Sequence, residues 1–359
     1  MSIQKARIPY RQPLFYGVTI AAILLLYLKF SELKLIQQLF TQSNWYYLAA
    51  VVLIQVLFFV VQAVNYRAVL QIKNLTVGIK ELFPIGYVVQ FLSQAIPTAG
   101  ISGQIFFIYY LKKYGLSVAE GIGRAILELA SLYIGYAVLF IISVVLLFRK
   151  DVFQHEPRFV FFIYAFLVFF LIIAVIVMLS QKRHHATRFH WIVKRISGYF
   201  KTTKLFDNPW MQALADGDYF AIVTEQFRET LGWNHLKHFK GTFTLACLWQ
   251  VVMLFSHALT LYLISWALGH PIPFAACFVA FTFSKFLSMI SVVPGAQGVF
   301  EGAMTLILIS FGVDKSVALA ATLLTRAFTF WLPMPIGWIL YGRYLKQFEK
   351  NEHDKIVVT

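Results

Sequence analysis

Val293-Pro294-Gly295-Ala296-Gln297-Gly298 interrupts a long apolar run between residues 272 and 311. Proline and closely spaced glycines break an α-helix, so we expect two short helices here rather than one long helix. Non-helical backbone at membrane depth persists only where it is buried in protein or lines a polar cavity. The broken region near 291–302 is therefore a candidate functional site.

An earlier apolar run, residues 82–110, is broken in the same way by Ile96-Pro97-Thr98-Ala99-Gly100-Ile101-Ser102-Gly103. A straight helix would not carry breakers at this density. We therefore expect a second pair of short helices, with the break near 94–104.

The two broken regions resemble one another in order and spacing. A Phe-Leu-Ser triplet precedes Pro97 and Pro294, and Gly115 and Gly312 each follow those prolines by 18 residues. A Ser-Val-Ala triplet then opens a long helix after each glycine. Inverted repeats with discontinuous helices meeting near the midplane are typical of alternating-access carriers. The alternative is that Gly and Pro are simply frequent in transmembrane helices.

The overall composition excludes a soluble enzyme. The chain is 59% hydrophobic and only 13% charged, with a mean hydropathy of +0.71, far outside the usage of soluble proteins. The net charge of +15 would suggest nucleic acid in a soluble chain, but in a membrane chain it indicates basic cytoplasmic loops beside anionic lipid headgroups. We therefore expect no nucleic-acid partner.

Apolar runs and basic segments together predict the topology. The fold class is an all-α polytopic membrane protein, an inverted repeat with two re-entrant (broken) helix pairs. Basic segments favour the cytoplasmic side, which places both termini there. The predicted division is a cytoplasmic N-terminus (1–13), a first membrane half (14–179), a basic cytoplasmic or interfacial loop (180–241), a second membrane half (242–341) and a cytoplasmic tail (342–359).

Two charged residues of the second half are candidates for the site, because charges within membrane spans need a partner or a water-filled route. Glu301 follows the second break by a few residues. It could attract a cationic headgroup, exchange a proton, or cap backbone amides of the helix that begins there. Arg326 lies near the middle of the last span. It could bind a lipid phosphate or form an ion pair with Glu301.

Three further charges lie in apolar segments. Arg124 and Glu128 are four residues apart, which favours a structural pair on one helix face over a place in the substrate path. Lys285 could extend outward to the membrane surface or face the second break. We find no catalytic motif, no metal-ligand spacing and no cofactor motif, so an enzyme is not expected.

The second half carries the residues of a known family pattern: Val293-Pro294-Gly295-Ala296-Gln297-Gly298-Val299-Phe300-Glu301-Gly302, then Gly312, then Arg326 followed by Trp331-Leu332-Pro333. In this it resembles the lysylphosphatidylglycerol synthase transmembrane-region family, also called flippase-like domain proteins. The first-half pattern of that family is matched by Pro97, Gly100, Gly103 and Gly115. The resemblance covers residues 14–345.

This resemblance implies a multi-pass protein of a bacterial or archaeal inner membrane that moves or handles lipids. It places Pro294, Gly295, Gly298, Glu301 and Arg326 on the family's motif positions. Ala296-Gln297 replaces what is often a Gly-apolar pair, and Gln104 stands where many relatives carry a charge. Those departures leave the substrate open.

The resulting prediction is a lipid flippase or transporter that moves a phospholipid or lipid-linked headgroup between leaflets. Because the chain ends at Thr359, we expect no aminoacyl-transfer domain after the membrane region. The alternative is an accessory subunit or an intramembrane lipid-modifying enzyme that works with a separate synthetase. Membrane phospholipids are the expected partners, and a lipid-modifying enzyme and a second copy of the chain are left open as others.

Overall fold

A computed structural model describes residues 41, 43–71, 75–95, 101–149, 166–168, 171, 240–291 and 293–357. Within these ranges the regular structure is entirely helical, which confirms the predicted all-α membrane fold. The first half contains α3 (Trp45–Gln71), α4 (Ile79–Ala95), α5 (Ile101–Leu111), the short 3₁₀ helix η1 (Lys112–Tyr114) and α6 (Val118–Arg149). The second half contains α13 (Lys240–Ala267), α14 (Phe274–Ile290), η3 (Pro294–Ala296), α15 (Val299–Ser310), α16 (Lys315–Arg326), the π-helical segment η4 (Ala327–Trp331) and α17 (Pro333–Val357).

Four segments of the described chain are long and apolar enough to cross a membrane: Trp45–Gln71, Val118–Leu147, Lys240–Ala267 and Lys315–Leu345. They lie within the two predicted membrane halves, except for a few residues at the start of Lys240–Ala267 and at the end of Lys315–Leu345. The predicted first half before residue 41, and most of it after residue 149, lies outside the described residues. The division into cytoplasmic and membrane segments stays a prediction.

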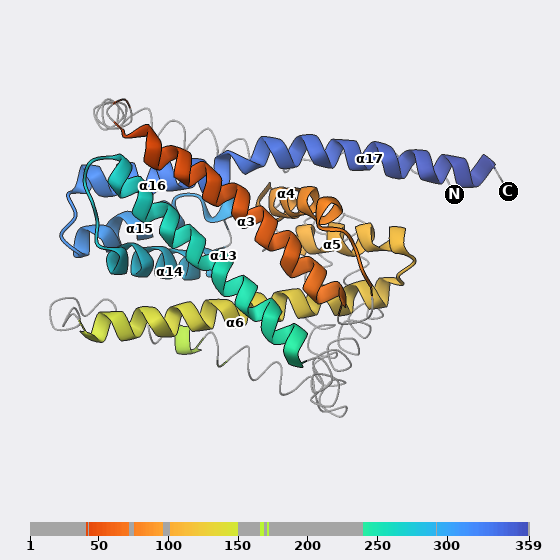
Figure 1. The fold of residues 1–359 in the computed structure, drawn as a ribbon, viewed down its shortest axis with the longest axis horizontal. Coiled ribbons are helices and arrows are strands. Elements are labelled where there is room, and N and C mark those ends of the chain that lie inside the picture. The colour runs from red at the N-terminus through yellow and green to blue at the C-terminus, as the bar shows by residue number, and fades with distance from the viewer. Residues whose placement is uncertain are drawn as a thin grey trace, which may run out of the picture.

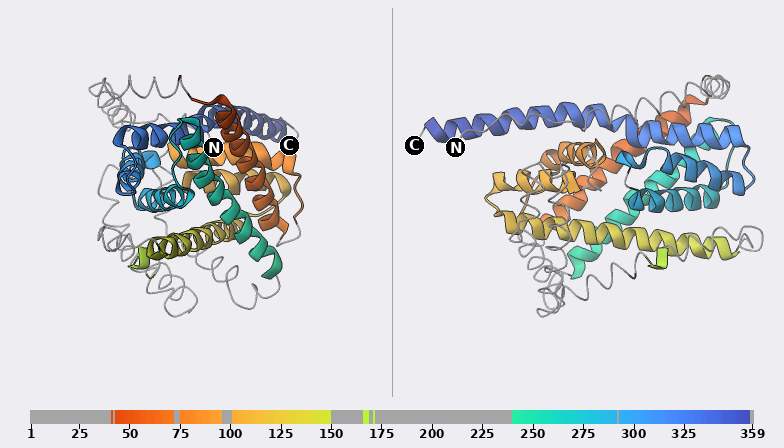
Figure 2. Two further views of the ribbon diagram at one scale, coloured as in Figure 1. Left: turned by 60° about the vertical axis from the view of Figure 1, so that its left-hand side comes forward. Right: turned by 180° about the vertical axis from the view of Figure 1, so that it is seen from behind.

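The two central helices run antiparallel to one another. The backbone N–H of Asn44, next to the start of α3, donates to the carbonyl of Ala267 at the end of α13 (2.8 Å). The pair α4 and α5 lies toward one end of the molecule, whereas α14, α15 and α16 lie toward the other (Figures 1 and 2). The long helix α6 passes beneath both groups (Figure 1). Each group of short helices therefore occupies its own end of the bundle.

The short helices of the two halves correspond closely. Helices α4 and α14 each contain 17 residues, and α5 and α15 contain 11 and 12. Gly115 (φ 78°) and Gly312 (φ 82°) adopt left-handed backbone, which glycine tolerates best, and the next long helix begins three residues after each of them. The shared order supports a duplication. Its inversion across the membrane and the re-entrant character of the pairs stay predictions.

The short helices of the two halves belong to different apolar clusters, and a side-chain cap starts α16. One buried cluster joins α6, α13, α14, α15 and α16, and another joins α3, α4 and α5. Asp314 caps α16 by accepting a hydrogen bond from the backbone N–H of Ser316 (2.8 Å). This cap fixes the direction in which α16 returns toward the second break.

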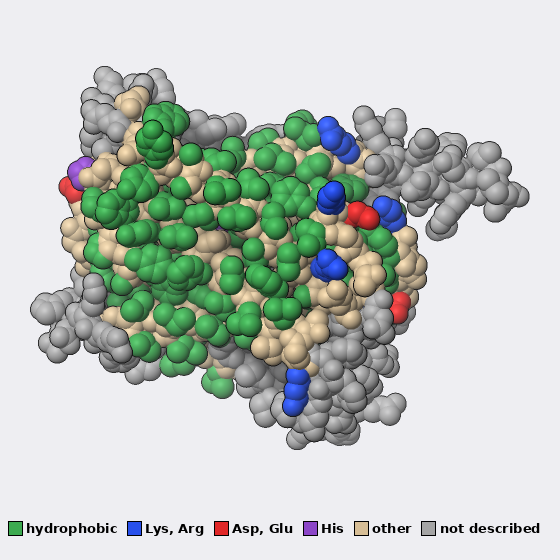
Figure 3. Space-filling view, viewed as in Figure 1, with side chains coloured by type: hydrophobic (Ala, Val, Ile, Leu, Met, Phe, Trp, Pro, Cys, Tyr) green, Lys and Arg blue, Asp and Glu red, His purple; other side chains and the backbone are tan. Residues whose placement is uncertain are grey.

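Apolar side chains cover most of the face in Figure 3, and its Lys and Arg side chains gather toward one end. The exposed Lys80, Lys112, Lys113 and Lys240 lie near the start of α4, just after α5 and at the start of α13. A wide apolar band with basic residues at one end is the surface expected of a membrane protein whose basic end faces the cytoplasm.

Candidate functional site

The second break is a turn of left-handed backbone between two helices. Helix α14 ends at Ile290, and Ser291 is extended (φ −69°, ψ 133°). Gly295, Ala296 and Gly298 then have φ values of 60°, 50° and 81°. A non-glycine residue in this region is strained by about 1–2 kcal/mol, so the conformation of Ala296 must be held by its surroundings. The carbonyl of Gly295 in this turn accepts a hydrogen bond from a side chain and not from a helical backbone N–H.

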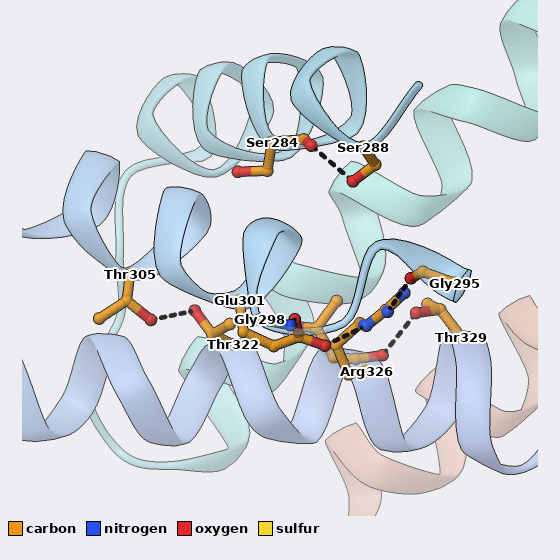
Figure 4. A network of polar contacts seen from close by, with 10 residues as sticks. Ser284, Ser288, Gly295, Gly298, Glu301, Thr305, Thr322, Arg326 and Thr329 are labelled. Carbon is orange, nitrogen blue, oxygen red and sulfur yellow. Dashed lines mark hydrogen bonds and ion pairs between the residues drawn. The ribbon is translucent and has the colours of Figure 1, made fainter. Parts of the chain in front are cut away.

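Arg326 connects this turn to the two helices that follow it. Its Nη2 donates to the carbonyl oxygen of Gly295 and its Nε donates to Oε1 of Glu301, both at 2.6 Å (Figure 4). The guanidinium carbon lies 4.8 Å from the ring centre of Phe300 and 4.2 Å from that of Phe330. Only 9% of the arginine side chain is exposed. The charge is thus held by an acid, a carbonyl and two aromatic faces.

Glu301 makes two contacts through its two carboxylate oxygens. Oε1 pairs with Arg326, and Oε2 accepts the backbone N–H of Gly298 at 2.7 Å. The carboxylate therefore acts both as a cap for α15 and as a partner for Arg326. Two of the roles considered from the sequence, the helix cap and the ion pair with Arg326, are therefore seen in the structure. Attraction of a cationic headgroup by Glu301, and proton exchange at its carboxylate, stay predictions.

Helix α4 of the first half reaches the same region. Arg326 is followed by the π-helical segment η4, and π-helical turns are frequent at functional sites. Gln90 of α4 donates its side-chain amide to the carbonyl of Thr329 in η4 (3.0 Å). Along α15 and α16, Thr305 also donates to Thr322 (3.2 Å; Figure 4). The broken region is therefore bounded by both halves of the chain.

Lys285 on α14 is close enough to interact electrostatically with Arg326 of this cluster and with His257 of α13. Its side chain is partly buried, and it lies within electrostatic range of Arg326. Among the described residues no hydrogen bond or ion pair is found for it. Its two predicted orientations, toward the membrane surface or toward the second break, stay open. Two cations and one acid thus lie near the turn.

The predicted pair Arg124–Glu128 differs from what the structure shows. Arg124 donates Nη1 to the backbone carbonyl of Glu120 (3.0 Å). Glu128 instead accepts hydrogen bonds from the side-chain amides of Gln104 (2.7 Å) and Gln250 (3.3 Å). Spacing put both charges on one helix face, but tertiary contacts from α5 and α13 supply the donors to Glu128. The expected pair is therefore not formed within the described residues.

The remaining candidates belong to the two breaks. Pro97 and Gly100 lie outside the described residues. Gly103 lies where α5 touches α4, and a Cβ at this position would lie 2.4 Å from the carbonyl oxygen of Val89. Pro294 and Gly298 lie in the second turn itself. Phe300, Phe330 and Gln90 were not foreseen, because an aromatic or amide residue in an apolar helix gives no signal of its own.

Comparison with known sequences identifies the family of this fold and site. Residues 14–337 match the sequence profile of the family described as "Lysylphosphatidylglycerol synthase TM region". The chain belongs to this family. Its membership confirms the resemblance inferred from the residues of the two breaks.

Three archaeal relatives, all named UPF0104 membrane proteins, extend this result. The protein of Methanocaldococcus jannaschii is 21% identical over 89% of this chain and 90% of its own length. That of Methanothermobacter thermautotrophicus is 25% identical over 81% of this chain and 83% of its own length. That of Pyrococcus horikoshii is 28% identical, but the match spans only 34% of this chain and 39% of the relative. The chain is therefore a multi-pass membrane protein of a lipid-related family.

Proposed function

We propose that this protein is a lipid transporter that moves a phospholipid or a lipid-linked headgroup between the leaflets. The observation that carries the proposal is the ion pair of Arg326 and Glu301 at the broken turn of the second half. The described residues that surround it come from both halves. They combine cationic, anionic and non-helical backbone groups, the elements from which midplane substrate sites are built.

The energetics of this pair support a role beyond packing. Removing two charges from water costs several kcal/mol per ion, and well-packed apolar residues often stabilise a protein as well as a buried pair does. Charges within membrane spans are accordingly rare and usually functional. Here the Glu301 side chain remains 18% exposed, so a ligand that reaches the turn can reach the carboxylate.

The chemistry of the cluster fits a phospholipid headgroup. The guanidinium of Arg326 can bind a phosphate through two donors, and Lys285 adds a second positive charge nearby. Glu301 can attract an ammonium or another cationic group of the same headgroup. Because Arg326 and Glu301 now satisfy one another, a zwitterionic ligand would replace their mutual contact with contacts of its own. The pair would reform once the lipid leaves.

The proposal includes a topology. The breaks near 94–104 and 291–302 are re-entrant turns that approach the midplane from opposite sides, in an inverted repeat. The basic end carries Lys112, Lys113 and Lys240 and faces the cytoplasm, as do both termini. The membrane is the inner membrane of a bacterium or archaeon. Gradients of the lipid or of an ion drive transport.

A leaflet-exchange assay in proteoliposomes tests this function. The full chain is reconstituted with fluorescent anionic, zwitterionic or aminoacylated phospholipids, and the labelled lipid that reaches the outer leaflet is measured. Wild-type protein is expected to exchange one headgroup class faster than protein-free vesicles do. Glu301→Gln is expected to lose this exchange while remaining folded, because it removes the charge and nearly preserves the shape.

The matched control is Asp314→Asn, which also removes one carboxylate from the α15–α16 region but leaves a side chain that caps helices equally well. It should exchange lipid like the wild type. Equal exchange by Glu301→Gln and wild type would contradict the role of the ion pair. No exchange of any lipid by folded wild-type protein would contradict transport itself and favour the accessory or lipid-modifying alternatives.

A further inference from the structure

A second polar cluster lies in the first half, where α3, α5, α6 and α13 pack together. Leu127 of α6 is buried in one cluster with Val69 of α3 and Ala246 of α13. Glu128 is adjacent to Leu127, and Gln250 lies one helical turn after Ala246, so both lie at this level.

Helix α5 closes the cluster from a further side. The ring of Phe107 stacks on Tyr66 of α3, with their centres 4.7 Å apart. Gln104 lies one turn before Phe107 and reaches Glu128 with its amide. The carboxylate of Glu128 is thus enclosed by side chains from α5, α6 and α13, beside α3.

The charge of Glu128 has no cationic partner within the described residues. The residue is only 5% exposed, and both of its hydrogen bonds come from neutral amides. Arg124, one turn away on the same helix, points its Nη1 to a backbone carbonyl. Buried carboxylates are ordinarily paired with a cation or coordinate one. An ionised Glu128 therefore needs a positive charge that none of these direct contacts supplies.

Several polar atoms around this carboxylate are also unsatisfied. Oε1 of Gln104, Oε1 of Gln250 and both amide atoms of Asn65 are buried without a hydrogen-bond partner in the described part of the chain. Asn65 is fully buried, and it lies one turn before Val69 on the face of α3 that packs against α6 and α13. Folded proteins leave few such atoms. Their concentration around one uncompensated carboxylate points to a ligand.

We propose that this cluster is a binding site for a small monovalent cation, with the chemistry of Na⁺. The carboxylate of Glu128 supplies one negative charge, which balances one positive charge. Oε1 of Gln104 and Oε1 of Gln250, which have no hydrogen-bond partner among the described residues, are neutral oxygen ligands beside it, and Oδ1 of Asn65 is a further one. Hard cations prefer such oxygen ligands.

The described residues contain no group of three or more His, Cys, Asp or Glu side chains that could hold a metal. One carboxylate among neutral amides suits an alkali cation rather than a transition metal. Arg124 is placed as the competitor of that cation. It lies one helical turn from Glu128 on the same helix, so its positive charge repels a cation held by the carboxylate without a direct contact between the two side chains.

This inference goes beyond lipid transport, and its test uses no lipid substrate. Full-length protein in detergent is equilibrated with radiolabelled Na⁺, and bound label is measured by scintillation proximity against unlabelled Na⁺, K⁺ and choline. We expect saturable binding at one site per chain, displaced by Na⁺ and not by choline. Glu128→Gln should weaken binding by roughly tenfold or more, because it removes the charged ligand.

The matched control is Glu120→Gln, which removes an exposed carboxylate two turns earlier on α6 and should bind Na⁺ like the wild type. Gln104→Leu should weaken Na⁺ binding, and Arg124→Gln should strengthen it. These two variants still test the proposal if Glu128→Gln does not fold. Unchanged binding by folded Glu128→Gln would overturn the proposal. So would the absence of saturable binding to wild type, since the cluster would then hold water only. Lipid exchange measured on the same preparation separates these failures from a failure of the transport proposal.

Discussion

Gly295→Ala tests the structure of the second break most directly. Gly295 has φ 60°, a left-handed conformation that costs an alanine about 1–2 kcal/mol. A Cβ at this position would also lie 2.6 Å from Cε2 and 2.7 Å from Cζ of Phe330. Overpacking of this kind typically costs about 1–3 kcal/mol. We therefore expect the free energy of unfolding to fall by about 2–5 kcal/mol.

The displaced ring also matters for the ion pair. Phe330 lies 4.2 Å from the guanidinium of Arg326, so a shift of the ring loosens the arginine. In the background Phe330→Leu the close contact is relieved, and Gly295→Ala should then cost only its backbone strain of about 1–2 kcal/mol. The difference between the costs of Gly295→Ala in the wild-type and Phe330→Leu backgrounds measures the energy of the contact between the added Cβ and the Phe330 ring.

Unfolding of the purified protein in mixed micelles, titrated with SDS and followed by circular dichroism, provides the assay. Gly302→Ala is the control, because this glycine lies within α15 and a Cβ there would contact nothing within 4 Å. It should raise stability by about 0.5–1 kcal/mol. If Gly295→Ala lowers the free energy of unfolding equally in the wild-type and Phe330→Leu backgrounds, the turn does not pack against the Phe330 ring as described.

Three further changes test other parts of the fold by the same unfolding assay. Asp314→Ala should lower stability by about 1 kcal/mol through loss of the α16 cap, whereas Asp314→Asn should leave it unchanged. Gly103→Ala should lower stability by about 1–3 kcal/mol or more, because its Cβ would approach the carbonyl of Val89, which cannot move alone. Burial and the hydrogen bond to Glu81 raise the pKa of Tyr114 above its ordinary value of 10.0. Its contribution to stability is thus complete below pH 10 and declines above it, as the unfolded chain ionises. Tyr114→Phe should make that alkaline decline shallower.

Local chemistry made the helices and their breaks predictable. Proline and glycine disrupt helices through their own backbones, so the break near 291–302 could be anticipated without tertiary information, and Gly115 and Gly312 marked where the next helices begin. Long apolar runs likewise predicted the four spans. The contact between Arg326 and Glu301 was one of two alternatives, because both charges need a partner in an apolar setting.

Tertiary contacts were less predictable because they depend on which helices meet. Arg124 and Glu128 have the spacing of a helical pair, but the carboxylate of Glu128 is hydrogen-bonded by side-chain amides from two other helices instead. Gln104 and Gln250 are neutral, and the residues next to them in the sequence do not indicate that they bind Glu128. The aromatic residues that hold Arg326 lie on two different elements. An apolar pattern predicts burial for them but not the charge they contact.

The two halves carry a similar polar link after each break, with a different charge in each half. Gln104 and Glu301 each lie seven residues after the proline of their break, and each bonds to the long helix that follows. The partner is an acid, Glu128, in the first half and a base, Arg326, in the second. A duplication that keeps this link while reversing the charge yields one centre suited to a cation and one suited to a phosphate. Both proposed sites are built from helices that share α6 and α13 as neighbours, and through these helices a cation gradient could act on the proposed lipid site.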